Sequence, residues 1–183
     1  MPFPKKIVSL FELSSSGGYR KESEWYGPFN ALLNYVFPIE EDYVVVPQYR
    51  RPEDLKSEEF TTIFVVRHKS HPVFFITIKP TCHIQYLSNR KEADQQTVEQ
   101  LNYLFDFVKI PKLYGISALG TRICLYAVDM DTGHIVPEGI LRDPNRITDT
   151  NPAHRWSLDI LTQKGEDRFQ EVVTEIKSMC RQE

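Results

Sequence analysis

The residue that most clearly suggests chemistry is Lys79, which ends the segment VFFITIK between Val73 and the proline at position 80. The segment is otherwise apolar and β-branched, which is typical of a buried strand. Alternate side chains of a strand point to opposite faces, so Thr77 and Lys79 share one face. A buried ammonium group without a partner is costly. Lys79 therefore either emerges into water at the strand end or meets a carboxylate at a reaction centre.

Basic residues occur in short clusters. Arg50-Arg51 opens the charged segment RRPEDLKSEE, and Arg90-Lys91 opens RKEADQQ. If these four residues converge near Lys79, they form a surface for nucleic acid, because Arg and Lys bind phosphate oxygens. The structural alternative is a set of solvated loop charges.

Cys82 and His83 follow the Lys79 strand directly. Adjacent residues on an extended chain point apart, so we expect a buried thiol here and not a Cys/His nucleophile pair. The chain has 3 cysteines and no C-x-x-C motif. This pattern argues against a zinc site or a disulfide framework and favours a reducing, intracellular setting.

Length and charge set further bounds. The chain has 183 residues and a formal net charge of −3, so any nucleic-acid surface must be local. No apolar run approaches the ~20 residues of a membrane span, so we expect no membrane partner. Both nucleic acid and protein remain as candidate partners.

Hydrophobic spacing and proline or glycine punctuation predict the elements that position these residues. We expect an α/β fold, with a mixed sheet flanked by helices. Gly120-Thr121 is expected to be a two-residue hairpin turn, and Arg155-Trp156 to anchor the C-terminal segment. The expected elements are a helix from Ser23 to before Pro38, strands 42–49, 60–68 and 73–80, a helix from about Asn89 to before Pro111, strands 113–120 and 122–129, and a helix 166–180.

The order helix, three meandering strands, helix, strand resembles the αβββαβ core of the PD-(D/E)xK nuclease-like superfamily, the restriction-endonuclease-like fold. The resemblance covers roughly residues 23–129. In that family an acid near the start of the second strand and an E-x-K or D-x-K on the third bind one or two Mg²⁺ ions. The lysine activates the attacking water, and a glutamate of the first helix often joins the site. We expect residues 1–21 to be an arm with a flexible Ser/Gly joint and residues 22–183 to be one nuclease-like domain.

Carried onto this sequence, the resemblance assigns the motif lysine to Lys79. Thr77 stands where the family has an acid, and its neutral hydroxyl is a poor Mg²⁺ ligand. The other assignments that the resemblance implies are Glu59, or Glu58, as the second-strand acid, Glu24 or Glu22 as the first-helix acid, Asp94 or Glu92 as a replacement acid from the next helix, and Gln95 or Gln96 as a polar residue beside the site.

The resemblance implies catalysis by Lys79, Glu59 and Asp94. It implies that Glu59, Glu24 and Asp94 would hold Mg²⁺ if the site is active, and that no cofactor is needed otherwise. The competing hypothesis is a non-catalytic module that keeps the fold and binds nucleic acid or protein. Several segments together also resemble a group of uncharacterised intracellular proteins of mushroom-forming fungi: EWYGPFNALLNYVFP, VVPQ, FFITIKP, EADQQ, GISALGTRICLY and RWSLDIL.

Overall fold

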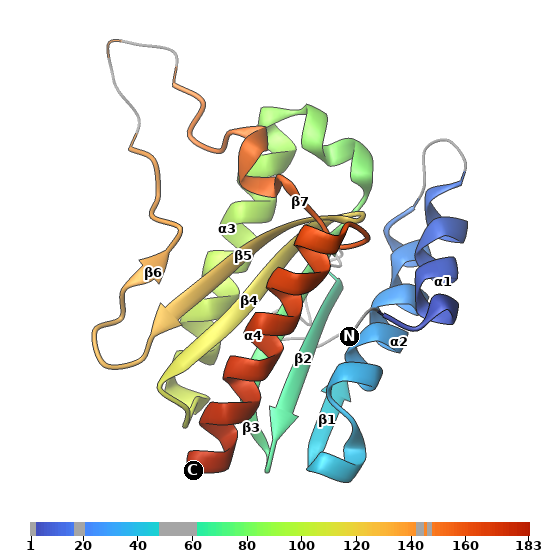
Figure 1. The fold of residues 1–183 in the computed structure, drawn as a ribbon. Coiled ribbons are helices and arrows are strands. Elements are labelled where there is room, and N and C mark those ends of the chain that lie inside the picture. The colour runs from blue at the N-terminus through green and yellow to red at the C-terminus, as the bar shows by residue number, and fades with distance from the viewer. Residues whose placement is uncertain (1–2, 17–20, 48–61, 142–144, 146–147) are drawn as a thin grey trace, which may run out of the picture.

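The computed structural model describes residues 3–16, 21–47, 62–141, 145 and 148–183 (Figure 1). No helix in this part of the chain is long and apolar enough to cross a membrane. The longer elements are α1 (Lys5–Ser15), α2 (Tyr26–Val36), β1 (Tyr43–Val46), β2 (Thr62–His68), β3 (His71–Lys79), α3 (Leu87–Leu104), β4 (Lys112–Leu119), β5 (Arg122–Asp129), β6 (Ile135–Val136), β7 (Leu158–Asp159) and α4 (Gln163–Gln182). Short 3-10 helices that matter below are η1 (Glu22–Trp25), η4 (Thr81–Gln85) and η6 (Ala153–Trp156).

The strands form one mixed sheet in the order β1-β2-β3-β4-β5-β6, with β7 also pairing with β5. β1, β2 and β3 pair antiparallel, β3 and β4 pair parallel, and β5 runs antiparallel to β4. Parallel neighbours need a crossover connection, which α3 provides. The expected α/β fold with a mixed sheet and flanking helices is confirmed.

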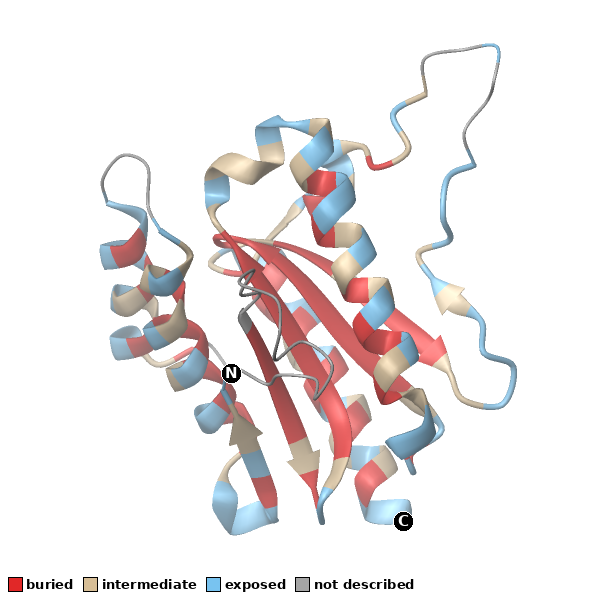
Figure 2. Cartoon of the chain, turned by 180° about the vertical axis from the view of Figure 1, so that it is seen from behind, coloured by how far each residue is buried: buried red, intermediate tan, exposed pale blue. Residues whose placement is uncertain are grey.

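The two faces of the sheet are covered by different helices. α4 crosses the near face in Figure 1, and α3 lies on the opposite face. On β3, Phe74 faces α4, where its ring meets that of Phe169 at 6.3 Å, whereas Thr77 faces α3 and contacts Thr97. The central strands β2 to β5 are buried along most of their length, as Figure 2 shows. The prediction of a buried strand is therefore confirmed, and β3 is covered on both faces.

The N-terminal segment forms helix α1, which lies beside α2 (Figure 1). Its buried residues Ile7 and Phe11 join the core, and the Phe11 ring meets the Phe29 ring of α2 edge-on at 4.9 Å. Residues 17–20 of the expected joint lie outside the described residues. At least α1 is thus packed against the domain.

The starts of three helices differ from the expectations. Ser23 and Asn89 do not cap a helix, since α2 and α3 begin at Tyr26 and Leu87 without a side-chain cap. α4 begins earlier than expected, at Gln163, where the Thr162 hydroxyl accepts a hydrogen bond from the Gly165 amide. Apolar spacing marks the buried face of a helix, and it leaves an exposed first turn undetermined.

Candidate functional site

Lys79 lies at the end of β3 and is only 8% exposed. Its Nζ donates a hydrogen bond to Glu92 Oε1 at 3.1 Å, and Glu22 Oε2 lies 3.9 Å away. Of the two alternatives for this lysine, the structure shows the carboxylate partner and not emergence into water. The two carboxylates offset the cost of burying the ammonium group. We call Lys79, Glu92 and Glu22, with His83 and Gln96 described below, the Lys79 cluster.

The local chain path brings these groups together. Pro80 ends β3, and η4 turns the chain into α3, which carries Glu92. The Gly120 amide, in the β4–β5 turn, donates to the Lys79 carbonyl at 3.0 Å and ties the strand end to that turn. Gly120 has φ +65°, and a Cβ there would collide with the Thr81 hydroxyl. Glycine is therefore favoured at this position, both for its backbone angle and for its lack of a side chain.

His83, in η4, lies in the electrostatic field of the same groups. Burial lowers the pKa of His83 and the Lys79 charge lowers it further, while Glu92 and Glu22 oppose that change. Its Nδ1 is buried and has no hydrogen-bond partner among the described residues. His83 was not among the predicted site residues, because the sequence suggested only Cys82 as its partner. Its position four residues after Lys79 is the feature of the sequence that could have indicated it.

Gln96 is the glutamine that adjoins the cluster. Its Nε2 donates to Glu92 Oε1 at 3.1 Å from one helical turn further along α3, and its Oε1 is buried without a partner in the described chain. Gln95 is exposed and donates to Glu99 at 2.8 Å. Gln96, and not Gln95, is therefore the glutamine that contacts Glu92 beside Lys79.

Asp94 does not join the Lys79 cluster. Its Oδ1 accepts hydrogen bonds from the Tyr126 hydroxyl at 2.6 Å and from Arg155 at 3.1 Å. Two residues along a helix correspond to a rotation of about 200°, so Glu92 and Asp94 point to different sides of α3. Glu92, and not Asp94, is the helix acid beside Lys79.

Thr77 is held in a neutral, closed environment. It is 2% exposed, and its hydroxyl lies 3.0 Å from that of Thr97 and 3.3 Å from the Ile116 carbonyl, to which it donates. Thr97 in turn donates to the Ala93 carbonyl at 2.8 Å. The Thr77 side chain is thus neutral, and its hydroxyl is used in hydrogen bonds within the core.

The remaining predicted site residues are placed as follows. Glu24 shares η1 with Glu22, but it is the Glu22 carboxylate that reaches Lys79. Arg90 is 7% exposed and bound within the protein, which removes it from a phosphate-binding surface, whereas Lys91 is exposed. Glu58, Glu59, Arg50 and Arg51 lie outside the described residues.

The Lys79 cluster has features that suit a hard cation. The carboxylate side chains of Glu22 and Glu92 are 21% and 50% exposed, so each remains open to solvent. Mg²⁺ is commonly held by one or two carboxylates, with water and substrate phosphates completing its shell. Within the described ranges, no three His, Cys, Asp or Glu side chains gather as a protein-only metal site. An ion bound by these two carboxylates would depend on water and substrate for its other ligands.

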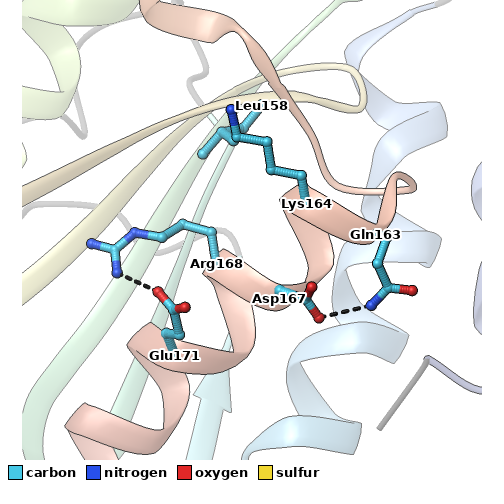
Figure 3. A pocket seen from close by; sticks show the side chains of 6 residues that line it. All are labelled: Leu158, Gln163, Lys164, Asp167, Arg168 and Glu171. Atoms are coloured by element: carbon cyan, nitrogen blue, oxygen red, sulfur yellow. Dashed lines mark hydrogen bonds and ion pairs between the residues drawn. The ribbon is translucent and has the colours of Figure 1, made fainter.

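A surface hollow of about 610 Å³ lies elsewhere, against the first turns of α4 (Figure 3). Four of the polar side chains that line it form two pairs, Arg168 with Glu171 at 2.7 Å and Gln163 with Asp167 at 2.7 Å. None of the residues that line it belongs to the Lys79 cluster. We therefore place the candidate chemistry at Lys79 and not in this hollow.

Comparison of the chain with protein families, with curated proteins and with solved structures found no match.

Proposed function

We propose that this protein is a nuclease-like α/β domain that hydrolyses phosphodiester bonds of nucleic acid with Mg²⁺ at the Lys79 cluster. The observation that carries the proposal is the convergence of two carboxylates on one strand-end lysine, with Glu92 at 3.1 Å and Glu22 at 3.9 Å from its Nζ. The order of the elements, with α2 before β1, β2 and β3 and with α3 and β4 after them, supports the same fold.

Each residue has a defined part in the proposal. Glu92 and Glu22 would hold the metal, and Glu92 takes the place of the acid that Thr77 does not supply. A bound Mg²⁺ would supply charge stabilisation for the phosphate. Lys79 orients the attacking water, and Gln96 fixes the Glu92 carboxylate through its 3.1 Å hydrogen bond.

The second candidate is a non-catalytic module of the same fold that binds nucleic acid or protein without cutting it. Its support is that the relevant groups already have partners. Lys79 is paired with two carboxylates, and the Thr77 hydroxyl is bound to Thr97 and Ile116. In this proposal the ion pairs serve stability and the surface serves binding.

A cleavage assay with matched variants separates the two. Single- and double-stranded DNA and RNA are incubated with the wild type, Glu92→Gln and Glu99→Gln, in Mg²⁺ or Mn²⁺. Both variants change one glutamate of α3 to its amide, but Glu99 bonds Gln95 away from the cluster. We expect Glu92→Gln to lose at least about 100-fold in rate, as is usual when an electrostatic catalytic group is removed, and Glu99→Gln to retain the wild-type rate.

Equal cleavage by wild type and Glu92→Gln would point to a contaminant and reject the enzyme. Tight binding of uncut substrate by the wild type would support the non-catalytic module. Metal binding is followed separately, as the rise in melting temperature of the wild type with Mg²⁺, which Glu92→Gln should reduce.

A further inference from the structure

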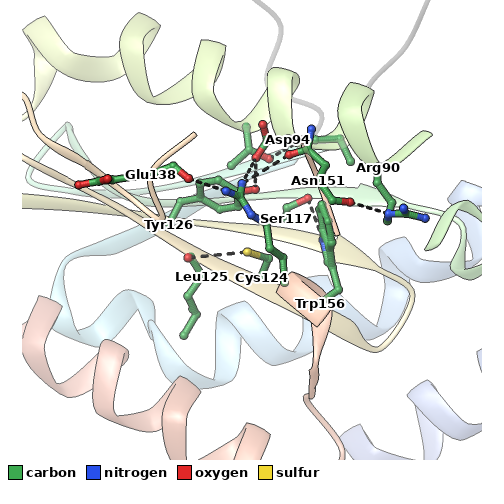
Figure 4. A network of polar contacts seen from close by, with 12 residues as sticks. Arg90, Asp94, Ser117, Cys124, Leu125, Tyr126, Glu138, Asn151 and Trp156 are labelled. Carbon is green, nitrogen blue, oxygen red and sulfur yellow. Dashed lines mark hydrogen bonds and ion pairs between the residues drawn. The ribbon is translucent and has the colours of Figure 1, made fainter. Parts of the chain in front are cut away.

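A second polar network joins α3 to the sheet and to the segment before α4 (Figure 4). Its α3 members are Arg90 and Asp94, two residues before and two residues after Glu92. Both contact residues 148–156, the segment that includes η6 and that we call the strap. The strap thus contacts α3 both before and after Glu92 in the sequence.

Arg90 joins three parts of the chain through one buried guanidinium. Its Nε donates to the Asn151 carbonyl at 2.7 Å, and its Nη2 donates to Asp149 Oδ2 at 2.8 Å, both in the strap. Its Nη1 donates to the Ile84 carbonyl at 2.8 Å, in η4 next to His83. Arg90 therefore fixes the first turn of α3 and η4 to the strap at the same time.

Asp94 provides the second attachment. The Tyr126 hydroxyl of β5 and Arg155 of the strap both donate to its Oδ1. Burial raises the pKa of Tyr126 above its usual range, so the hydroxyl stays a neutral donor. Trp156 is fully buried, and its indole donates to Ser117 Oγ of β4 at 3.3 Å. The strap is thereby anchored to the sheet as well as to α3.

We propose that the strap is the positioning element of the Lys79 cluster. Without it, Arg90 would be a buried cation that has lost two of its three partners, which is strongly unfavourable. The start of α3 and η4 must then shift to solvate Arg90, and Glu92 and His83 shift with them. The effect on hydrolysis rests on the proposed function, whereas the effect on the environment of Lys79 does not.

The test measures how readily the Lys79 amine reacts. Wild type, Asp149→Asn and Glu175→Gln are treated with an amine acylating reagent, and the rate at each lysine is followed by peptide mass spectrometry. The two variants are matched, because each removes the charge from a carboxylate with a 2.8 Å ion pair and with 43% and 42% of its side chain exposed. Glu175 pairs with Lys112, on the α4 face, so a faster rate at Lys112 verifies the method in that variant.

We expect Asp149→Asn to raise the Lys79 rate at least about fivefold, the effect of roughly 1 kcal/mol of local stability. Glu175→Gln should leave the Lys79 rate unchanged. Tyr126→Phe, which removes one hydroxyl and keeps the ring, should also raise it. Unchanged Lys79 reactivity in both Asp149→Asn and Tyr126→Phe, with the strap amides exchanging faster, would overturn the proposal.

Steady-state kinetics distinguish a role in positioning from a role in substrate binding, because the two affect kcat and KM differently. If the wild type cleaves nucleic acid, Asp149→Asn should lower kcat with little change in KM, since the strap contacts no substrate-binding group of the proposal. If the wild type does not cleave, the proposed hydrolysis fails and the acylation rates still decide the role of the strap.

Discussion

The hydroxyl oxygens of Thr77 and Thr97 lie 3.0 Å apart in the buried contact between β3 and α3. This contact is one of those that hold the buried face of α3 against the sheet, together with the apolar residues Ala93, Leu101 and Leu104. The Thr77 hydroxyl is thus satisfied within the core, by Thr97 and by the Ile116 carbonyl.

Thr77→Val should cost about 1 kcal/mol of unfolding free energy, because Val keeps the shape and Thr97 keeps its bond to Ala93. Thr77→Glu should cost about 3 kcal/mol or more, since it buries a carboxylate without a partner. Urea denaturation measures both. An equally stable Thr77→Glu protein would show that the position has room for an acid, and recovery of its stability by Mg²⁺ would show a metal pocket.

Gln100→Leu should stabilise the protein by about 1 kcal/mol. Gln100 is fully buried on α3, and neither atom of its amide has a hydrogen-bond partner among the described residues. A leucine of similar size removes this unsatisfied polar group. Thermal unfolding gives the result, with Gln95→Leu as the exposed control on the same helix. A loss of stability would instead indicate that an ordered water satisfies the amide.

Gly115→Ala should destabilise the protein by about 1–3 kcal/mol through overpacking. A Cβ at Gly115 would collide with the ring of Phe75 on the neighbouring strand. Phe75→Leu removes the ring that a Cβ at position 115 would meet, so Gly115→Ala should cost less unfolding free energy in that background. A double-mutant cycle measures this coupling, and additive effects of the two changes would contradict the packing argument.

Glu175→Gln should flatten the acid side of the stability profile. Burial opposes the charged form, but hydrogen bonds from Lys112 and Tyr114 outweigh it and leave the Glu175 pKa below its usual value. A lowered folded pKa stabilises the protein above the unfolded pKa of about 4.3, and this contribution is lost as pH falls through the folded value. Because the pair is partly exposed, we expect only about 0.5–1 kcal/mol at pH 7.

Chemical denaturation between pH 3 and 7 tests this prediction. The free energy of unfolding of the wild type should exceed that of Glu175→Gln at neutral pH. The two values should converge as the pH falls. A constant difference across the range would mean that Glu175 acts through packing and not through its charge.

The sequence predicted the elements that build the site better than the contacts within it. The apolar run before Lys79 and its alternation identified a central strand, and Gly120-Thr121 identified the turn that lies against its end. The choice between Glu92 and Asp94 could not be made from spacing. A helix rotates about 100° per residue, so an error of two residues in its start reverses the face assigned to each acid.

The sequence by itself determined an α/β protein with a lysine at the end of a buried strand, because side-chain alternation and proline are local effects. Only the tertiary structure decided which groups meet that lysine. Glu22, His83 and Glu92 come from η1, η4 and α3, and their approach depends on how these elements pack on β3. The same packing turned Arg90 from an expected phosphate ligand into a buried clamp, because a guanidinium binds whichever oxygens the fold places around it.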